Sequence, residues 1–157
     1  MQIKSNAFRP EEKIPERYTC RGEDISPDIS WENVPDKART FALIMDDPDA
    51  PGGTWVHWVV YNIPAATRSL PVHVSTADKL ENGAIQGITS FRKIGYGGPC
   101  PPVGHGPHRY YFKLYALDTR LELEPGASKE DLLKAMDGHI LDQSELMGRF
   151  ERKAEGL

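Results

Sequence analysis

The chain has 157 residues, with 23 acidic and 19 basic side chains and a formal net charge of −4. This length suits a single domain, because folding then buries roughly 70 % of the surface of the unfolded chain. Charges of both signs are scattered along the sequence, without the basic run that follows a phosphate backbone, which argues against nucleic acid as a partner. We therefore expect one cooperative domain over residues 1–157.

The N-terminal sequence MQIKSNAFRPEEKIPERY contains no apolar signal-peptide core, and no segment approaches the roughly 18 apolar residues of a membrane span. We therefore expect a cytoplasmic protein without integral membrane association. The two cysteines, Cys20 and Cys100, lie far apart in the sequence and are too few for a disulfide-dense scaffold. In a reducing cytoplasm we expect two buried thiols rather than a disulfide, with a reactive Cys100 facing a pocket as an alternative.

Short apolar segments separated by 13 prolines and 14 glycines predict many short strands joined by shaped loops. In chain order, the sequence predicts strands over residues 2–5, 28–31, 40–46, 55–63, 84–88 and 108–117. Three of them are rich in β-branched and aromatic residues and are partly apolar on both parities: 40–46, 55–63 and 108–117. We expect these three to be central strands covered on both faces.

Residues 89–107, before the last of these strands, show no period of either kind. An irregular segment of this length in a compact domain is usually functional or disordered. Its prolines and aromatic residues favour an ordered loop.

A helical pattern occurs only near the C-terminus, over residues 128–136. Ser128 can cap this helix, and acidic residues in its first turn suit the helix dipole. Its apolar stripe consists of Leu132, Leu133 and Met136. Gly138 then interrupts the pattern, and we predict a second short helix over 139–146 before an extended segment at 147–152.

The segment DDPDAPGGTWVHW presents two carboxylates on a rigid turn. Asp47 precedes a proline, and the surrounding proline rings stiffen the turn that carries Asp49. Trp55 and His57 share one parity of the following strand, so their side chains point to the same face. Taken alone, these residues favour the simpler interpretation of a core histidine and turn-forming aspartates over a ligand site.

The segment GHGPHR leads into the strand 108–117, just as the aspartate turn leads into the strand 55–63. Two such strands can bring both loops to one end of a sheet. A pocket with Asp47, His57 and His108 would then suit a small anion that carries its own protons, such as phosphate. Arg109 has the opposite parity to His108, and we expect it to form an ion pair with a carboxylate of the aspartate turn.

The motifs DPDAP, TWVHW and GPHRYYF, together with YTCRGEDISPDISWENVP and GGPCPPVGHGPHRY, resemble the phosphatidylethanolamine-binding protein family. They are most similar to its bacterial and archaeal branch, often labelled Raf kinase inhibitor-like. The resemblance runs from about Phe8 to Arg152. It implies a mainly β fold: a β-sandwich of two antiparallel sheets with Greek-key connections, one or two short helices near the C-terminus and a small anion pocket at one end.

Carried over residue by residue, the resemblance implies a ligand pocket formed by Asp47, Trp55, His57, Pro99, His108 and Tyr110. Asp49 and Arg109 would support this pocket, and no cofactor, metal or catalytic residue is implied. His105, three residues before His108, is an additional histidine of this branch. The resemblance also suggests a homodimer.

The sequence therefore predicts a non-catalytic module that binds phosphate or a phospholipid head group and acts as an inhibitor or modulator of a kinase or protease. The alternative is a metal-dependent hydrolase, in which His57, His105, His108 and Asp47 or Asp49 bind zinc. A covalent hydrolase has only Cys100, paired with a loop histidine, as a candidate nucleophile.

Overall fold

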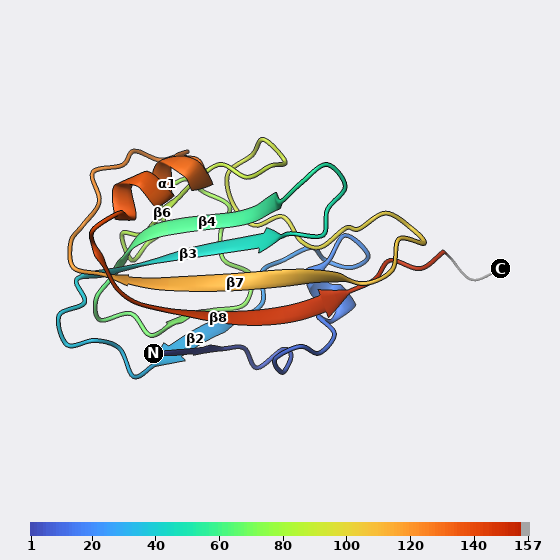
Figure 1. The fold of residues 1–157 in the computed structure, drawn as a ribbon, viewed down its shortest axis with the longest axis horizontal. Coiled ribbons are helices and arrows are strands. Elements are labelled where there is room, and N and C mark those ends of the chain that lie inside the picture. The colour runs from blue at the N-terminus through green and yellow to red at the C-terminus, as the bar shows by residue number, and fades with distance from the viewer. Residues whose placement is uncertain (155–157) are drawn as a thin grey trace.

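Two antiparallel sheets form the framework of the computed structural model, which describes residues 1–154 (Figure 1). The smaller sheet has the order β1-β2-β5, with strands β1 (Gln2–Lys4), β2 (Ile29–Glu32) and β5 (Ser69–Leu70). The larger has the order β6-β4-β3-β7-β8, with strands β3 (Thr40–Asp47), β4 (Trp55–Pro64), β6 (Ile85–Gln86), β7 (His108–Leu117) and β8 (Ile140–Phe150). A 3₁₀ turn, η1 (Glu16–Tyr18), and a helix, α1 (Lys129–Met136), complete these elements.

The larger sheet has Greek-key order, because β7 returns to pair with β3 rather than with β6. All of its strand pairs are antiparallel. The predicted mainly β sandwich of two antiparallel sheets is therefore confirmed.

Strand β3 lies at the centre of the larger sheet, and all eight of its residues are buried. Side chains of one parity, such as Phe41 and Leu43, pack into the core between the two sheets. Side chains of the other parity, such as Ala42 and Ile44, pack into a second core beneath α1. Apolar residues on both parities thus correspond to two covered faces, as the sequence predicts.

Helix α1 covers the outer face of the larger sheet (Figure 1), and Leu132 and Met136 pack into the second core. The Ser128 side chain accepts a hydrogen bond from the backbone N–H of Asp131, whose carboxylate in turn accepts from the Ser128 N–H. At the first residue of the helix, the Nζ of Lys129 lies 2.7 Å from Oδ2 of the buried Asp46 on β3. The predicted helix and its cap are confirmed. No helix within residues 1–154 is long and apolar enough to cross a membrane.

The predicted second helix over 139–146 is wrong, because residues 140–146 belong to β8 and His139 lies in the turn before it. Strand β8 pairs with β7 over the whole length of β7, from His108 opposite Phe150 to Leu117 opposite Ile140. Hydrogen bonding to the ten-residue β7 overrides the weak helical pattern of this segment. Its first half, including Ile140 and Leu141, stays largely exposed, and its last residues are buried alternately, as is typical of an edge strand.

The larger sheet brings the two polar loops predicted from the sequence to one of its ends. Asp47, the last residue of β3, pairs with Trp55, the first residue of β4. His108 begins β7, which runs antiparallel to β3, and Asp46 pairs with Tyr111. The aspartate turn and the loop before His108 therefore meet at this end.

The contribution of the α1 N-cap to stability can be tested by mutation. We expect Ser128→Ala to lower the free energy of unfolding by about 1 kcal/mol, because it leaves a helix N–H without its acceptor. Ser128→Asp, which restores an acceptor, should retain most of the wild-type stability. Urea denaturation followed by circular dichroism measures both, and an unchanged midpoint in Ser128→Ala would contradict the role of the cap.

Candidate functional site

A cavity of about 240 Å³ opens at the end of the larger sheet where the two loops meet. This volume is small for a ligand pocket and suits a ligand of few atoms. The structure brings five of the sequence-predicted site residues to its wall: Asp47, Trp55, His57, His108 and Tyr110. Six further residues complete the lining: Ala50, Pro51, Phe91, Cys100, Pro101 and Pro102.

Pro99 does not line this cavity, although the resemblance places it in the pocket. It is buried, and its carbonyl accepts a hydrogen bond from the N–H of Cys20. The following prolines, Pro101 and Pro102, contact the cavity instead. The proline run PCPP marks this wall in the sequence, but it does not show which ring faces inward.

His57 is buried, and its Nδ1 lies 2.6 Å from the carbonyl oxygen of Gly97. Since a carbonyl only accepts, Nδ1 carries the proton and Nε2 carries a lone pair in the neutral ring. Nε2 has no hydrogen-bond partner within residues 1–154. Burial lowers the pKa of His57 below its ordinary value, against smaller opposing effects of the Gly97 carbonyl and nearby carboxylates.

Gly97 holds His57 in place through a second hydrogen bond, from its own N–H to the His57 carbonyl. A larger residue would displace the ring of Phe91, because a Cβ atom on Gly97 would lie 2.5 Å from it. Phe91 in turn packs edge-on against His57 and Trp55. The irregular segment 89–107 thus builds one wall of the cavity, and its lack of period hid Phe91 and Gly97 from sequence analysis.

Tyr110 lies on β7 two residues after His108, fully buried, with its ring edge-on to that of His57. Its hydroxyl has no hydrogen-bond partner within the described chain. Burial raises the pKa of Tyr110 well above its ordinary value, and the negative charge of Asp47 adds to this effect. The hydroxyl therefore stays protonated and able to donate.

His108 is held between two side chains. Its Nδ1 lies 2.7 Å from Oδ2 of Asp47, and its Nε2 lies 2.6 Å from Nδ1 of His105. Asp47 also accepts a hydrogen bond from the N–H of Asp49, at 2.7 Å. Both ring nitrogens of His108 are therefore engaged within the protein. The sequence singled out His105 but gave it no role, whereas the structure places it as the outer member of a chain from Asp47 through His108.

Arg109 forms the ion pair that the sequence predicts. Its Nε and Nη2 donate to the two carboxylate oxygens of Asp49 at 2.9 and 2.8 Å, and its backbone N–H donates to the same carboxylate. This bidentate geometry is the strong form of such pairs. Hydrogen bonding to Arg109 is the largest cause that lowers the pKa of Asp49 to about 2.

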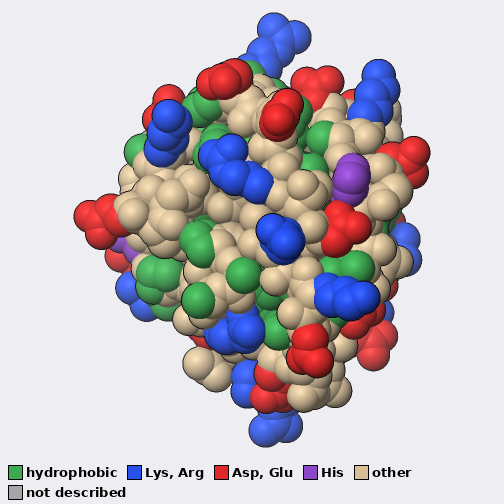
Figure 2. Space-filling view, turned by 90° about the vertical axis from the view of Figure 1, so that its left-hand side faces the viewer, with side chains coloured by type: hydrophobic (Ala, Val, Ile, Leu, Met, Phe, Trp, Pro, Cys, Tyr) green, Lys and Arg blue, Asp and Glu red, His purple; other side chains and the backbone are tan. Residues whose placement is uncertain are grey.

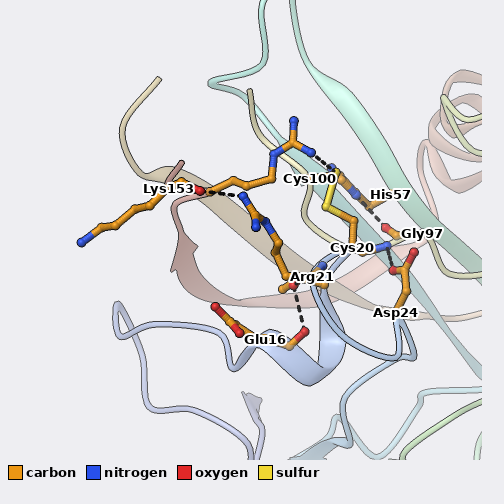
Figure 3. The surroundings of a disulfide bond; sticks show 11 residues. Glu16, Cys20, Arg21, Asp24, His57, Gly97, Cys100 and Lys153 are labelled. Carbon is orange, nitrogen blue, oxygen red and sulfur yellow. Dashed lines mark hydrogen bonds between the residues drawn. A yellow bond between two sulfur atoms is a disulfide. The ribbon is translucent and has the colours of Figure 1, made fainter. Parts of the chain in front are cut away.

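Cys20 and Cys100 are joined in a disulfide (Figure 3), so the prediction of two thiols is wrong. The segment after η1 folds against the loop before Cys100: Asp24 accepts from the N–H of Gly98, and Tyr96 donates to the Tyr18 carbonyl. These contacts bring the two cysteine Cα atoms to 5.4 Å, a normal spacing for a disulfide.

Because Cys100 forms the disulfide, it has a structural role and carries no free thiol. Cys100 lines the cavity, and the disulfide lies beside His57 and Gly97 in Figure 3. A reactive Cys100 and the covalent hydrolase that depends on it are therefore not available in the bridged protein. Within residues 1–154, no group of three or more His, Cys, Asp or Glu side chains is arranged to hold a metal ion.

The ion pair with Arg109 should appear in an acid titration of Asp49. Because the pKa of Asp49 is depressed in the folded protein, its ionised form stabilises the fold at neutral pH, and this contribution is lost as pH falls from about 4 towards 2. A carboxyl-carbon NMR titration should show Asp49 ionised well below its ordinary range. Arg109→Gln should return the pKa towards that range, whereas Arg120→Gln, at the other end of β7, should not.

The disulfide should be detectable both chemically and in stability. Unreduced protein should take up no iodoacetamide, as measured by mass. The variant Cys20→Ser, Cys100→Ser should lose about 2–4 kcal/mol of unfolding free energy, because the bridge closes a loop with a sequence separation of 80 residues. Wild-type protein in excess dithiothreitol should match the double variant. Alkylation of both cysteines without reductant would rule out the bridge.

Comparison with known proteins agrees with this fold. The family described as phosphatidylethanolamine-binding protein matches residues 4–151. A UPF0098 protein of Methanothermobacter thermautotrophicus is 53 % identical, over 97 % of this chain and 99 % of its own.

Two solved structures are also similar. A putative phosphatidylethanolamine-binding protein homolog of Chlamydia trachomatis, CT736, is 43 % identical with a TM-score of 0.88, over 96 % of this chain and 97 % of its own. E. coli YbcL, described as a new member of the mammalian PEBP family, is 35 % identical with a TM-score of 0.89 and the same coverage. The chain therefore belongs to the phosphatidylethanolamine-binding protein family.

Proposed function

We propose that this protein is a non-catalytic module whose cavity binds a small anion, either phosphate or a phosphorylated head group. Family membership supports a ligand-binding module, and the state of Tyr110 supports an anion as the ligand. The Tyr110 hydroxyl is a buried donor without a partner among the described residues, and such a donor costs about 1–3 kcal/mol when nothing satisfies it. An oxygen atom of a bound anion would satisfy it.

His57, whose ring packs edge-on against that of Tyr110, complements this donor. At neutral pH its unpartnered Nε2 accepts, which suits the P–OH group of a singly protonated phosphate. After protonation the same atom donates to an anionic oxygen, and the ring adds a positive charge. Because burial lowers the pKa of His57, this stronger mode is reached only on the acidic side of its ordinary titration range.

Asp47 and His108 contribute through their mutual hydrogen bond. The bond leaves Asp47 as a buried carboxylate that retains accepting capacity towards a protonated ligand oxygen. His108 donates to Asp47 and so orients this carboxylate next to the ligand. With His105 on its other nitrogen, His108 positions Asp47 rather than contacting the ligand directly.

The rim of the cavity is apolar. Trp55 is 37 % exposed there, and Phe91 and the two prolines after Cys100 surround it. Apolar and aromatic side chains suit the carbon atoms that follow a phosphate in an esterified head group. Phosphorylethanolamine is therefore the probe that tests this part of the proposal, beside inorganic phosphate.

Action on a kinase or protease, a homodimeric state and a cytoplasmic location remain predictions from the sequence. So does the metal-dependent hydrolase with His57, His105 and His108. Metal analysis of the purified protein tests the hydrolase directly, and near-stoichiometric zinc would favour it over the anion-binding module.

Calorimetric titration of phosphate and phosphorylethanolamine at pH 5 to 8.5 tests the anion site. Binding should weaken as pH rises, because neutral His57 cannot donate from Nε2. Sulfate carries no proton in this range, so any pH dependence of sulfate binding comes from titration of the protein and not of the ligand. His57→Gln should remove the pH dependence of sulfate binding, and Tyr110→Phe should raise the dissociation constant about tenfold.

Tyr115→Phe is the matched control, since Tyr115 has the opposite parity on the same strand and lies outside the cavity. It should bind like the wild-type protein. An affinity for sulfate and phosphate that is flat across this pH range, or equal in Tyr110→Phe and wild type, would contradict the proposed site.

A further inference from the structure

We propose that a second cavity, next to the first, is a separate binding site for a multiply charged oxyanion such as a polyphosphate or polycarboxylate. This cavity has a volume of about 610 Å³ and lies between η1, the residue before His108 and the C-terminal end of β8. Five basic residues line it: Lys13, Arg21, Arg149, Arg152 and Lys153.

The charge of this cavity is opposite to that of the protein. The whole chain is acidic, with a net charge of −4, whereas the basic side chains here outnumber the two acidic ones, Glu16 and Glu151. At the other end of the larger sheet, seen in Figure 2, side chains of both signs are interspersed. A concave surface that gathers one sign of charge concentrates oppositely charged ligands.

The backbone holds two of these cations side by side. The segment before η1 forms a parallel bridge with the edge of β8, in which Lys13 lies opposite Arg149. Hydrogen bonds from the N–H of Ile14 to the Arg149 carbonyl and from the N–H of Arg149 to the Glu12 carbonyl fix this arrangement.

No acidic side chain within the described residues forms an ion pair with Lys13 or Arg149. Across the other ladder Arg149 faces a third cation, Arg109, whose guanidinium is engaged with Asp49. Like charges held opposite one another destabilise a sheet, and a bound anion would reverse this effect.

Arg152 provides the second observation. Its side chain is half-buried, its Nε is buried without a hydrogen-bond partner in the described chain, and its Nη1 lies 3.5 Å from Sγ of Cys100. A disulfide sulfur is a weak acceptor for a charged donor. Buried donors of a charged group are normally satisfied, so this guanidinium is matched to an oxyanion, which it can bind through two parallel N–H groups.

The segments that line the second cavity are bonded to one another. Arg21, in the turn after η1, donates to the carbonyl of Lys153 and ties this turn to the segment after β8 (Figure 3). The disulfide anchors the same turn from its other side. The cations are thus carried by segments that are fixed to one another and not by a free tail.

The two cavities share a wall but differ in chemistry. Cys100 lines the first cavity and contacts Arg152 of the second, and Pro107 of the second precedes His108 of the first. The first offers one tyrosine hydroxyl and a histidine in a narrow aromatic space. The second is larger and is lined by five lysine and arginine side chains. The second site therefore does not depend on the first.

Pyrophosphate and citrate at pH 8 are the probes, because His57 is then neutral and the first cavity is at its weakest. We expect pyrophosphate to bind the wild-type chain in calorimetry, with an affinity that falls as sodium chloride is raised. The variant Arg149→Gln, Arg152→Gln should raise the dissociation constant about tenfold or more. His57→Gln should bind pyrophosphate like the wild type. The ratio of citrate to pyrophosphate affinity distinguishes a carboxylate from a phosphate ligand.

The matched control is Arg39→Gln, Arg120→Gln, which removes the same charge from a cavity at the opposite end of the sheet. It should change the pyrophosphate dissociation constant by less than about twofold. Circular dichroism of each variant verifies folding. Equal weakening in both double variants would reduce the effect to net charge and overturn the proposal. Wild-type affinity in Arg149→Gln, Arg152→Gln, or loss of pyrophosphate binding in His57→Gln, would overturn it as well.

Discussion

This end of the molecule depends on the hydrogen bonds between the first two residues of β7, His108 and Arg109, and the aspartates Asp47 and Asp49. The His108 and Arg109 side chains point to opposite faces of β7. His108 binds Asp47 and Arg109 binds Asp49, two residues further along the same segment. Two hydrogen-bonded pairs, one of them the Arg109–Asp49 ion pair, thus fix the turn from both sides. Without them the chain between β3 and β4 would be joined to β7 only by the strand ladder below.

These hydrogen bonds determine which polar atoms of the cavity remain available to bind a ligand. Asp47 and His108 use their hydrogen-bonding groups on each other and on neighbours, and His105 occupies the outer nitrogen. Within residues 1–154, the cavity atoms left without partners are the Tyr110 hydroxyl and Nε2 of His57. In the proposed site, the paired side chains form the frame and these two atoms face the ligand, so that binding depends on the protonation of His57.

The disulfide links the two cavities to the same framework. It joins the turn after η1 to the loop that carries Cys100, and so it stands between the aromatic cavity and the cationic one. Five of the basic side chains of this acidic protein therefore gather on one side of the disulfide. The anions proposed for the two cavities differ in size and charge, although neighbouring segments build both.

The sequence by itself determined the elements that depend on local pattern: the three central strands, the helix capped by Ser128 and the polar loops before Trp55 and His108. It also placed Arg109 against the aspartate turn, because strand parity is a local property. Only the tertiary structure decided the rest. The pairing of β8 with β7 and the Cys20–Cys100 bridge join residues that are distant in the sequence. The surroundings of the Tyr110 hydroxyl and the lining of the cationic cavity also come from distant segments. Such contacts are set by how whole sheets and loops pack, which no short segment encodes.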